Sequence, residues 1–444
     1  MEISVERYHY PIGQGTFSAQ IIRANVEEYV CVYDCGSSTY KKEMKNKPGA
    51  NKFSGWVKEL RQRTNGVINL LVISHFDEDH FNGVGELLKK FKIKKIVIPY
   101  MSKIEKIIFS LSHPYNIQGT ELQDSWSPGN FFAGALVGAL GDDLGTLGSL
   151  EGVEIIESTE EFSIEYFDLN SNTSEGRGKS FQVWEFCHFP LFSGVDDSVK
   201  NEYIENFRDE VYKALNKDVE NIGMHDLNNK LIVFKKIYRS TCEKVKKKYN
   251  RIGIKDIFNA SSVILYSGPA RDILGPGWGF INRVSEGRQV ADRYRITNAC
   301  REEDFRYYSK SDDFEYMGGW LGTGDALLKD PANIHEIKVN LGQMRINRIR
   351  VITVPHHGSR NNSDYEFYDI FSRPRVECIV HSKPGGGYRH PHAETKEVIA
   401  RMGFIEIPVT EEDGSLYVEY LSNDYWSFCC FRGRVQCRCD FWSN

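Results

Sequence analysis

The segment VINLLVISHFDEDHFNG, residues 67–83, joins a short apolar run to a polar stretch that is rich in metal-binding side chains. The run from Val67 to Ile73 is apolar except for Asn69 and is rich in β-branched residues, which predicts a fully buried strand. A helix is predicted directly afterwards by the apolar spacing of Val84, Leu87, Leu88 and Phe91. The polar stretch would therefore be a loop at the carboxyl end of a strand, where α/β folds place their sites.

Four side chains in this loop are potential metal ligands: His75, Asp77, Asp79 and His80. Imidazole and carboxylate together suit Zn, Mn or Fe, and the absence of cysteine argues against a purely structural zinc site. Alternate positions of an extended segment point the same way, so one side of the loop can hold one ion and the adjacent Asp79 and His80 a second. The alternative is a solvated acidic turn with two unrelated histidines, but His-x-Asp-x-Asp-His after a buried strand is much rarer than an acidic loop.

The loop resembles the HxHxDH signature of the metallo-β-lactamase fold, with Asp77 in place of the second histidine. The HxDxDH form is similar to that of the metallo-β-lactamase domain in bacterial competence DNA-uptake proteins of the ComEC type. Further segments resemble family motifs in the family's order: GQGTF (13–17) with VYDCGSS (32–38), NASSVILYSG (259–268), GTGDALL (322–328), VPHHGSRNNS (354–363) and YRHP (388–391).

This resemblance implies an α/β fold, the αββα sandwich of the metallo-β-lactamase fold, with a large insertion. We expect residues 1–100 and 255–410 to form the core, 101–254 to be an insertion that flanks the active site, and 411–444 to be a C-terminal β extension. Within the insertion, alternation predicts strands at 153–158, 162–168 and 180–186 that extend one sheet. Amphipathic helices are predicted at 197–216 and 227–250.

The resemblance also implies two metal sites that share Asp325 of the TGD segment. The first site would be His75, Asp77 and Asp325, and the second would be Asp79, His80, His357 and Asp325. The first site lacks the additional histidine that the fold usually has, and Asn259 or Ser261 occupies the corresponding region. A carboxylate-rich set of this kind favours Mn²⁺ at least as much as Zn²⁺, so the expected cofactors are two divalent ions of either kind.

Three residues are assigned to catalysis: Asp79, His356 and His390. Of the two consecutive histidines, His357 is assigned to the metal and His356 to a contact with the transition state, and the reverse assignment stays open. His390 matches the family's closing His-Pro and is a candidate general acid, the alternative being a packed or solvent-facing histidine held by its proline. Asp34 ends a strand and marks the edge of the site in the family, the alternative being an ordinary strand-end turn.

These residues suit hydrolysis in which a metal-bridged hydroxide attacks an ester phosphorus or a carbonyl carbon. The first hypothesis is a phosphodiesterase, most directly a nuclease acting on DNA or RNA. The second is a hydrolase of a small-molecule or nucleotide second-messenger ester. The third is a non-catalytic interaction protein stabilised by its metal. The relatives also suggest a defence role against foreign DNA, with a protein partner from a multi-gene system.

Composition places limits on these hypotheses. The 444 residues are 41% hydrophobic and 26% charged, as in globular proteins. The net charge of −5 offers no global attraction for nucleic acid, so a polyanion would need local cations such as those of residues 244–251, KVKKKYNR, although a solvated helix end explains them as well. Five arginines between 288 and 306 are further candidates, with surface ion pairs as the alternative.

The expected location is the cytoplasm. No apolar run reaches the length of a membrane span, and the first residues, MEISVERYHY, do not resemble a signal peptide. The ten cysteines are irregularly spaced, which favours reduced thiols. Four of them in the last strands could hold zinc, but their spacing fits no known finger and buried thiols are the preferred interpretation: Cys429, Cys430, Cys437 and Cys439.

Overall fold

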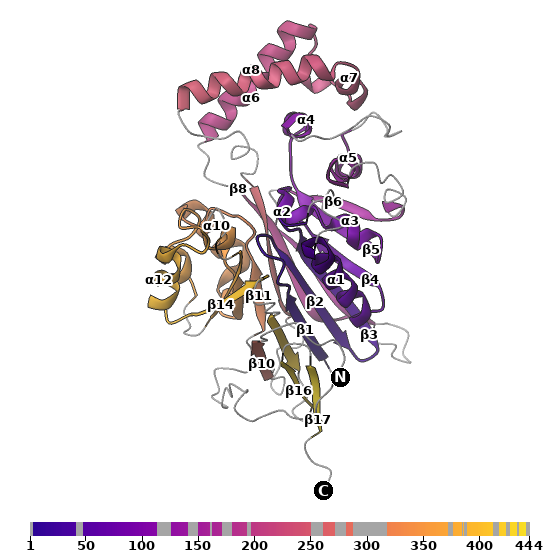
Figure 1. Cartoon of the computed structure of the whole chain (residues 1–444), viewed down its shortest axis with the longest axis vertical. Helices are drawn as coiled ribbons and strands as arrows, with labels where there is room; N and C mark the ends of the chain where they lie inside the picture. The colour runs from indigo at the N-terminus through magenta and orange to yellow at the C-terminus, as the bar shows by residue number, and fades with distance from the viewer. Residues whose placement is uncertain are drawn as a thin grey trace.

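The computed structural model of the chain has two mixed β-sheets packed face to face, with helices on both outer faces (Figure 1). This confirms the predicted αββα fold class. The structure describes residues 3–40, 48–112, 126–140, 150–159, 162–170, 180–192, 197–249, 261–270, 281–286, 318–371, 376–383, 385, 389–411, 417–422, 427–432 and 435–440.

The first sheet has eight described strands in the order β10-β15-β1-β2-β3-β4-β5-β6. Its antiparallel part includes the three N-terminal strands, and β3 to β6 run parallel. The bounds are β1 Ile3–His9, β2 Phe17–Ala24, β3 Glu27–Cys35, β4 Val67–Val72, β5 Lys92–Pro99, β6 Glu154–Ser158, β10 Ile281–Glu286 and β15 Tyr417–Ser422.

The second sheet has seven described strands in the order β14-β13-β12-β11-β9-β8-β7. Strands β11 to β14 are parallel and β7, β8, β9 and β11 pair antiparallel. The bounds are β7 Ser163–Asn170, β8 Ser180–Phe192, β9 Ser261–Pro269, β11 Gly319–Gly322, β12 Ile349–Thr353, β13 Glu377–Ser382 and β14 Ile405–Thr410. A separate hairpin of β16, Ser427–Arg432, and β17, Val435–Asp440, follows near the C-terminus, within the predicted β extension.

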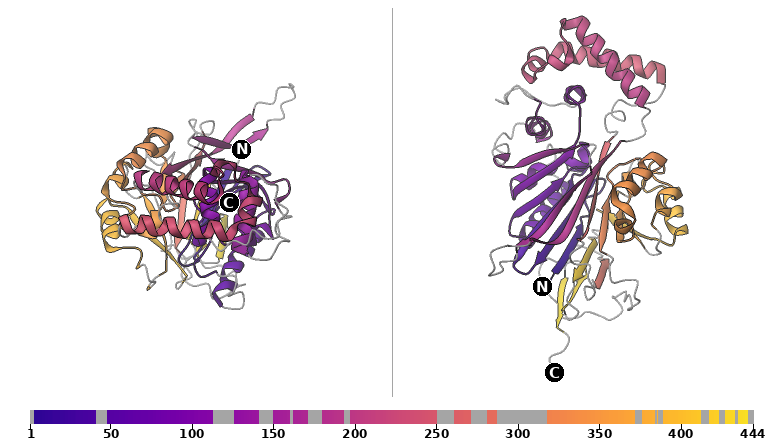
Figure 2. Two further views of the ribbon diagram at one scale, coloured as in Figure 1. Left: turned by 90° about the horizontal axis from the view of Figure 1, so that it is seen from above. Right: turned by 180° about the vertical axis from the view of Figure 1, so that it is seen from behind.

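Most helices cover the two outer faces of the sandwich (Figure 2). On the first sheet lie α1 Pro48–Arg63, α2 Glu78–Phe81, α3 Val84–Leu88, α4 Lys103–Ser112 and α5 Pro128–Leu140, and on the second lie α10 Pro331–Ile346, α11 Tyr365–Asp369 and α12 Ala393–Arg401. Beyond one end of the sandwich lie α6 Asp197–Leu215, α7 Met224–Asn229 and α8 Leu231–Tyr249, where α8 packs on α4 and α6. One helix was predicted over 227–250, but the structure has two there, α7 and α8.

Three hydrophobic clusters correspond to the three interfaces between layers. The strand predicted before the metal-binding loop shows how one strand serves two of them. Leu70 and Val72 pack between the sheets, whereas Leu71 and Ile73 pack against the helices on the outer face. A third cluster lies between the second sheet and α10 to α12. Burial on both faces explains why this strand is apolar at every position except Asn69.

The strands of residues 101–254 join both sheets, not one as expected. Strand β6 pairs in parallel with β5 in the first sheet, and β7 and β8 extend the second sheet from β9. Alternation in sequence predicts which residues face a core, but it carries no information about which sheet receives the strand.

Helices α4 and α5 pack directly on the metal-binding loop. Phe76 lies between two of the predicted ligands and is turned away from them. Its ring contacts Phe109 of α4 and Phe131 of α5 at centroid distances of 5.4 and 5.5 Å. Phe81 contacts Phe132 in the same way at 5.7 Å. The ligand-bearing loop is therefore held from behind by residues outside the segments that resemble the family.

No helix among the described residues has both the length and the apolar character that crossing a membrane requires.

Truncating Phe131 to alanine should destabilise the chain by about 3–5 kcal/mol, because it removes a buried ring from this aromatic cluster. Urea unfolding followed by circular dichroism measures the change. Met344→Ala is the control, because that side chain is 69% exposed and its loss should cost less than about 0.5 kcal/mol. Equal effects of the two substitutions would contradict the packing described for α5.

A buried histidine lies between the sheets and away from the predicted ligands. His188 of β8 is 1% exposed, and neither of its ring nitrogens has a hydrogen-bond partner among the described residues. Burial, with a smaller contribution from the charge of Lys95, lowers the pKa of His188 to about 4. The folded state therefore holds this ring neutral at a pH where the unfolded chain would protonate it.

This difference should make stability depend on pH. Above pH 6.5 the ring is neutral in the folded and the unfolded state, so it makes no contribution to the pH dependence of stability. Below pH 6.5 the unfolded chain gains the proton first, and stability therefore falls until about pH 4. The contribution at pH 4.5 is about 2–3 kcal/mol. Between pH 7 and 4.5 the free energy of unfolding should fall by about 2–3 kcal/mol less in His188→Leu than in wild type. Urea unfolding with chelator present measures both. Parallel pH profiles for the two proteins would refute the burial of a neutral ring.

Candidate metal centre

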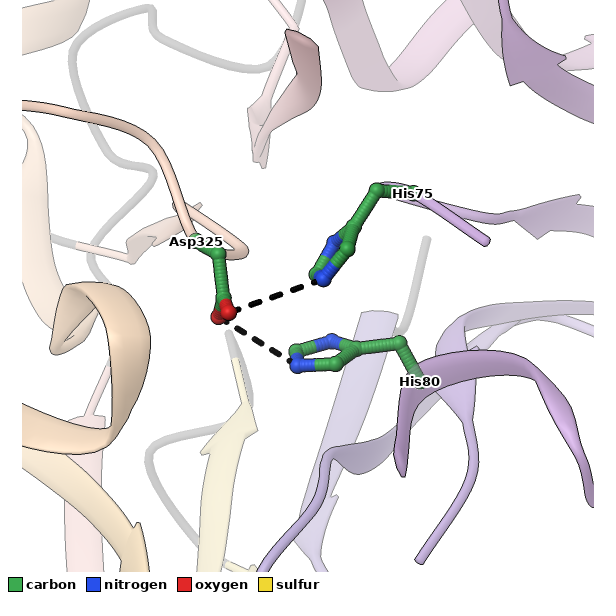
Figure 3. A group of neighbouring side chains, drawn as sticks. All are labelled: His75, His80 and Asp325. Carbon is green, nitrogen blue, oxygen red and sulfur yellow. Dashed lines mark ion pairs between the residues drawn. The ribbon is translucent and has the colours of Figure 1, made fainter. Parts of the chain in front are cut away.

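The predicted ligands converge from both sheets at the carboxyl ends of parallel strands. His75 follows β4, Asp325 follows β11, and His356 and His357 follow β12. Figure 3 shows the Asp325 carboxylate directed at the rings of His75 and His80. Because β11 and β12 are parallel neighbours, their ends bring Asp325 and the two histidines to one edge of the second sheet.

Asp79 and His80 lie in the short helix α2, not on a loop as expected. Two glycines allow the backbone to approach this helix. A Cβ on Gly15, whose φ is +142°, would lie 2.6 Å from the carbonyl oxygen of Asp79, and one on Gly36 would lie 2.5 Å from the amide nitrogen of His80. The amide of Thr16 also donates a hydrogen bond of 3.0 Å to the Asp79 carbonyl. The GQG and DCG segments therefore hold the helix that carries two of the ligands.

Two groups of side chains are close enough to hold an ion. One is His75, His80 and Asp325, and the other is Asp79, His80 and His357; within each group the ligand atoms lie within 4.8 Å of one another. His80 Nε2 lies 3.3 Å from Asp325 Oδ1, and His357 Nε2 lies 3.3 Å from Asp79 Oδ2. His75 Nε2 is 3.6 Å from Asp325 Oδ2 and 3.7 Å from Asp77 Oδ2.

The histidine nitrogens that face this space are left for a metal. The Nε2 atoms of His75, His80 and His357 and the Oδ1 atom of Asp325 are buried without a hydrogen-bond partner among the described residues. Each Nδ1 is instead engaged: that of His75 with Ser74 Oγ at 2.9 Å, and that of His357 with the carbonyl oxygen of His381 at 3.0 Å. Buried, unpartnered Nε2 atoms with their Nδ1 atoms anchored are what metal-ligating histidines require, so the residues fit a metal centre.

Asp34 fixes the tautomers of two of these rings. Its carboxylate is fully buried and accepts hydrogen bonds from the Ser74 amide, from Ser74 Oγ and from His80 Nδ1, at 2.7, 2.7 and 2.8 Å. His80 must therefore carry its proton on Nδ1. Because the single Ser74 hydroxyl proton goes to Asp34, Ser74 Oγ accepts from His75 Nδ1. Both rings then present the Nε2 lone pair to the centre.

The charges in the centre favour ionised carboxylates. Burial raises the pKa of Asp325, but the positive fields of His356, His80 and His75 outweigh it and hold the pKa well below the usual range. Burial likewise raises the pKa of Asp79, and the contacts with His357 and His80 bring it below its usual value. Burial lowers the pKa of His80, but the carboxylates of Asp325 and Asp34 have the larger effect and raise it well above its usual value. Partly buried anions with imidazoles between them suit a divalent cation.

The turn after β12 is strained. His356 and His357 both have left-handed backbones, with φ of 47° and 56°, a conformation that costs non-glycine residues roughly 1–2 kcal/mol each. A hydrogen bond of 3.0 Å from the His356 amide to the Gly324 carbonyl ties this turn to the turn of Asp325. Backbone strain of this kind is common at active sites and ligand-binding sites.

The other predicted site residues lie at the rim or outside the described part of the chain. Asp77 is partly exposed beside His75, and its role as a ligand stays a prediction. The His390 ring lies 5.4 Å from the ring of His356, and burial, with the neighbouring histidines, lowers the pKa of His390 to about 4. Its role as general acid stays a prediction. Several predictions fall outside what the structure describes: those on Asn259, on the five arginines between 288 and 306, and on the side chains of Ser261 and the four C-terminal cysteines.

Comparison with protein families agrees with this geometry. Residues 19–100 match the model of the metallo-beta-lactamase superfamily. The matching segment spans β2 to β5 and includes all four predicted ligands of the first loop, whereas Asp325 and His357 lie outside it and are joined to it by the fold. A search of curated proteins found no match. The superfamily match and the two ligand groups are those of a metal-dependent hydrolase; the narrower resemblance to competence proteins stays a prediction.

Some residues of the centre were not found by sequence reasoning. Ser74 and the carbonyl of His381 hold ligand rings, and Asn362 and Ser262 hold the backbone of Asp325 through hydrogen bonds of 2.9 and 3.2 Å. Ser74 directly precedes the first ligand, which is a signal that could have been used. A backbone carbonyl such as that of His381 has no signature in a sequence.

Asp34→Asn should weaken metal binding by roughly 10–100-fold, because an amide cannot accept the proton of His80 Nδ1 in the same way. Asparagine tolerates the left-handed backbone of Asp34, whose φ is 55°, so the backbone should persist. Titration of the metal-free protein with Mn²⁺ or Zn²⁺ measures the change. Asp369→Asn, at an exposed position of α11, is the control. Unchanged affinity in Asp34→Asn would show that the Asp34 carboxylate does not position the ligands.

Proposed function

We propose that the chain is a phosphodiesterase that uses two divalent ions and that its substrate is a nucleic acid. The observation that carries this proposal is the orientation of Asp325. Its Oδ1 atom faces His80 Nε2 at 3.3 Å, and its Oδ2 atom faces His75 Nε2 at 3.6 Å. One carboxylate turned toward two sets of donors is what a bridging ligand requires, and paired ions suit in-line displacement at phosphorus.

When bound, the ions would polarise the ester and lower the pKa of the attacking water. The chain's own residues do the positioning. His75, Asp77 and Asp325 would hold the first ion, and Asp79, His80, His357 and Asp325 the second, as predicted from the sequence. Asp34 and Ser74 orient the rings. His390, at the edge of the site, is proposed to donate a hydrogen bond to the leaving oxygen from its neutral ring, because its lowered pKa makes it a poor proton donor near pH 7.

Preference for a polyanion is supported by local charge on the insertion. Helix α8 carries Lys236, Arg239 and Lys247 on its exposed side. Figure 1 shows α6 and α8 beyond the end of the sandwich at which α2 lies. These cations could contact phosphates of a long substrate in spite of the net charge of −5. The predictions of a protein partner and of a defence role belong to this proposal and have no support of their own in the structure.

The second candidate is a hydrolase of a small-molecule or second-messenger ester. It is favoured by the acidic net charge and by the position of the inserted helices at the same end as the metal centre. Such a substrate would not need cations away from the centre. The two candidates therefore differ in the salt dependence of binding, which is steep for a polynucleotide and shallow for a small ester.

Linear single-stranded DNA, duplex DNA, RNA and a generic phosphodiester should be tested as substrates with Mn²⁺ and with Zn²⁺. We expect cleavage of at least one polynucleotide, and a loss of at least about 100-fold in rate in Asp79→Ala, since a proposed ligand of the second ion is removed. Asp369→Ala is the matched control and should retain wild-type rates.

Three results would change this proposal. Cleavage of the generic diester alone would favour the small-ester hydrolase. Equal polynucleotide cleavage in Asp79→Ala and wild type would show a contaminating nuclease. No cleavage of any substrate by a protein that holds two ions would favour the non-catalytic, metal-stabilised alternative.

A further inference from the structure

Helix α8 carries a row of basic side chains on the side opposite its buried face. An α-helix turns about 100° per residue, so Lys236, Arg239 and Lys247 lie within about 80° of one another around the helix axis. All three are exposed. The opposite side carries Phe234 and Val245, which are buried in the hydrophobic cluster that also holds residues of α4 and α6. Lys236, Arg239 and Lys247 are called the basic row below.

The basic row differs from the neighbouring lysines in having no counter-ion. On the side toward α6, Lys244 Nζ lies 2.8 Å from a carboxylate oxygen of Glu210. Lys248 Nζ lies 2.6 Å from one of Glu202. Within the described part of the chain, no ion pair joins a side chain of the basic row to a carboxylate. Glu243 lies on the same side of the helix, so three cations and one carboxylate give this side a positive charge although the whole chain is acidic.

The basic row is separate from the metal centre. Figures 1 and 2 show α8 at the outer limit of the molecule, beyond the end of the sandwich at which α2 lies. A rise of about 1.5 Å per residue places Lys236 and Lys247 about 16 Å apart along the helix axis. One strand of duplex DNA has a phosphate about every 3.4 Å along its axis, so the row is as long as about five of them. The row therefore matches a repeated anion better than a single one.

The side chains on this side of α8 separate three kinds of anionic partner. A lipid surface requires an apolar helix face, and that of α8 is already buried, with Ile232 alone 86% exposed near its beginning. Folded protein partners are usually held by aromatic anchors, and single strands by stacking of bases on aromatic rings. Between Ile232 and Lys247 this side of the helix carries no aromatic residue. Contacts to phosphates alone are what remains, and these favour the high charge density of a duplex.

We propose that the basic row is an anchoring surface for the phosphate backbone of double-stranded nucleic acid, separate from the metal centre and indifferent to base sequence. The choice of occupant rests on the proposed function, in which a long substrate is held at α8 while another part of it reaches the ions. Anchoring of this kind strengthens substrate binding without touching the reacting atoms, so its loss should raise KM for duplex more than it lowers kcat.

Fluorescence anisotropy of a labelled duplex of mixed sequence tests the proposal. The metal-loaded protein is titrated at several KCl concentrations, with phosphorothioate linkages in the duplex to slow its hydrolysis. The variant combines Lys236→Gln, Arg239→Gln and Lys247→Gln. The slope of log affinity against log salt should become shallower by about 2–3, because each lost phosphate contact removes about 0.9. Changing the base sequence of the duplex should leave the affinity of wild type unaltered.

Two further variants control for net charge. Lys58→Gln, Lys94→Gln and Lys338→Gln, combined in one protein, remove the same charge from exposed positions of α1, β5 and α10, and the wild-type slope should persist. Glu243→Gln removes the one carboxylate beside the basic row and should tighten duplex binding. Circular dichroism checks that each variant keeps the wild-type fold.

Equal slopes for the basic-row variant and the dispersed-lysine control would overturn the anchoring role, and duplex cleavage by wild type would still leave the proposed function standing. Binding to vesicles of anionic lipid but not to duplex would overturn it as well and assign the row to a membrane surface. A wild-type protein that binds duplex through the row but cleaves no polynucleotide would instead refute the proposed function and retain the anchoring surface.

Discussion

The buried carboxylate of Asp34 is the constraint on which the rest of the centre depends. A charge without exposed surface is costly unless hydrogen bonds and opposite charge compensate it. Here three donors converge on it, two from Ser74 and one from His80. These hydrogen bonds fix the orientation of the Ser74 and His80 side chains, and they fix the positions of the hydroxyl proton and of the Nδ1 proton. The consequence reaches two ligand rings, whose remaining lone pairs are left facing Asp325.

The metal centre also joins the two halves of the sandwich. His75 and His80 belong to the first sheet and its helices, and Asp325 and His357 to turns of the second sheet. The hydrophobic cluster between the sheets brings these edges together, but it is apolar and fixes no positions at the level of single atoms. The polar contacts at the edge supply that definition, including the hydrogen bond from the Tyr33 hydroxyl to the Val263 carbonyl across the two sheets.

Local patterns in the sequence predicted much of this arrangement. The buried strand before His75 followed from a short, mainly apolar run and the αββα class from motif order, and both are seen in the structure. What could not be predicted depends on contacts between distant residues. The hydrogen bonds between Asp34 and Ser74 span forty positions, and no periodicity encodes them. For the same reason, alternation identified β6, β7 and β8 as strands without showing that they divide between two sheets. The position of His356 depends on a backbone conformation that its residue type does not suggest.

The aromatic contacts behind the metal-binding loop bear on the modularity of this protein. Phe76 and Phe81 separate the ligands in sequence and pack on rings from α4 and α5. The segment that the sequence predicts to be an insertion is thus part of the wall against which the ligands are set. A shortened chain with the insertion excised would expose those rings and loosen the loop, and a chimera with a relative's insertion would inherit a different wall. In this protein, changes to the insertion that alter substrate range would also alter how firmly the metal is held.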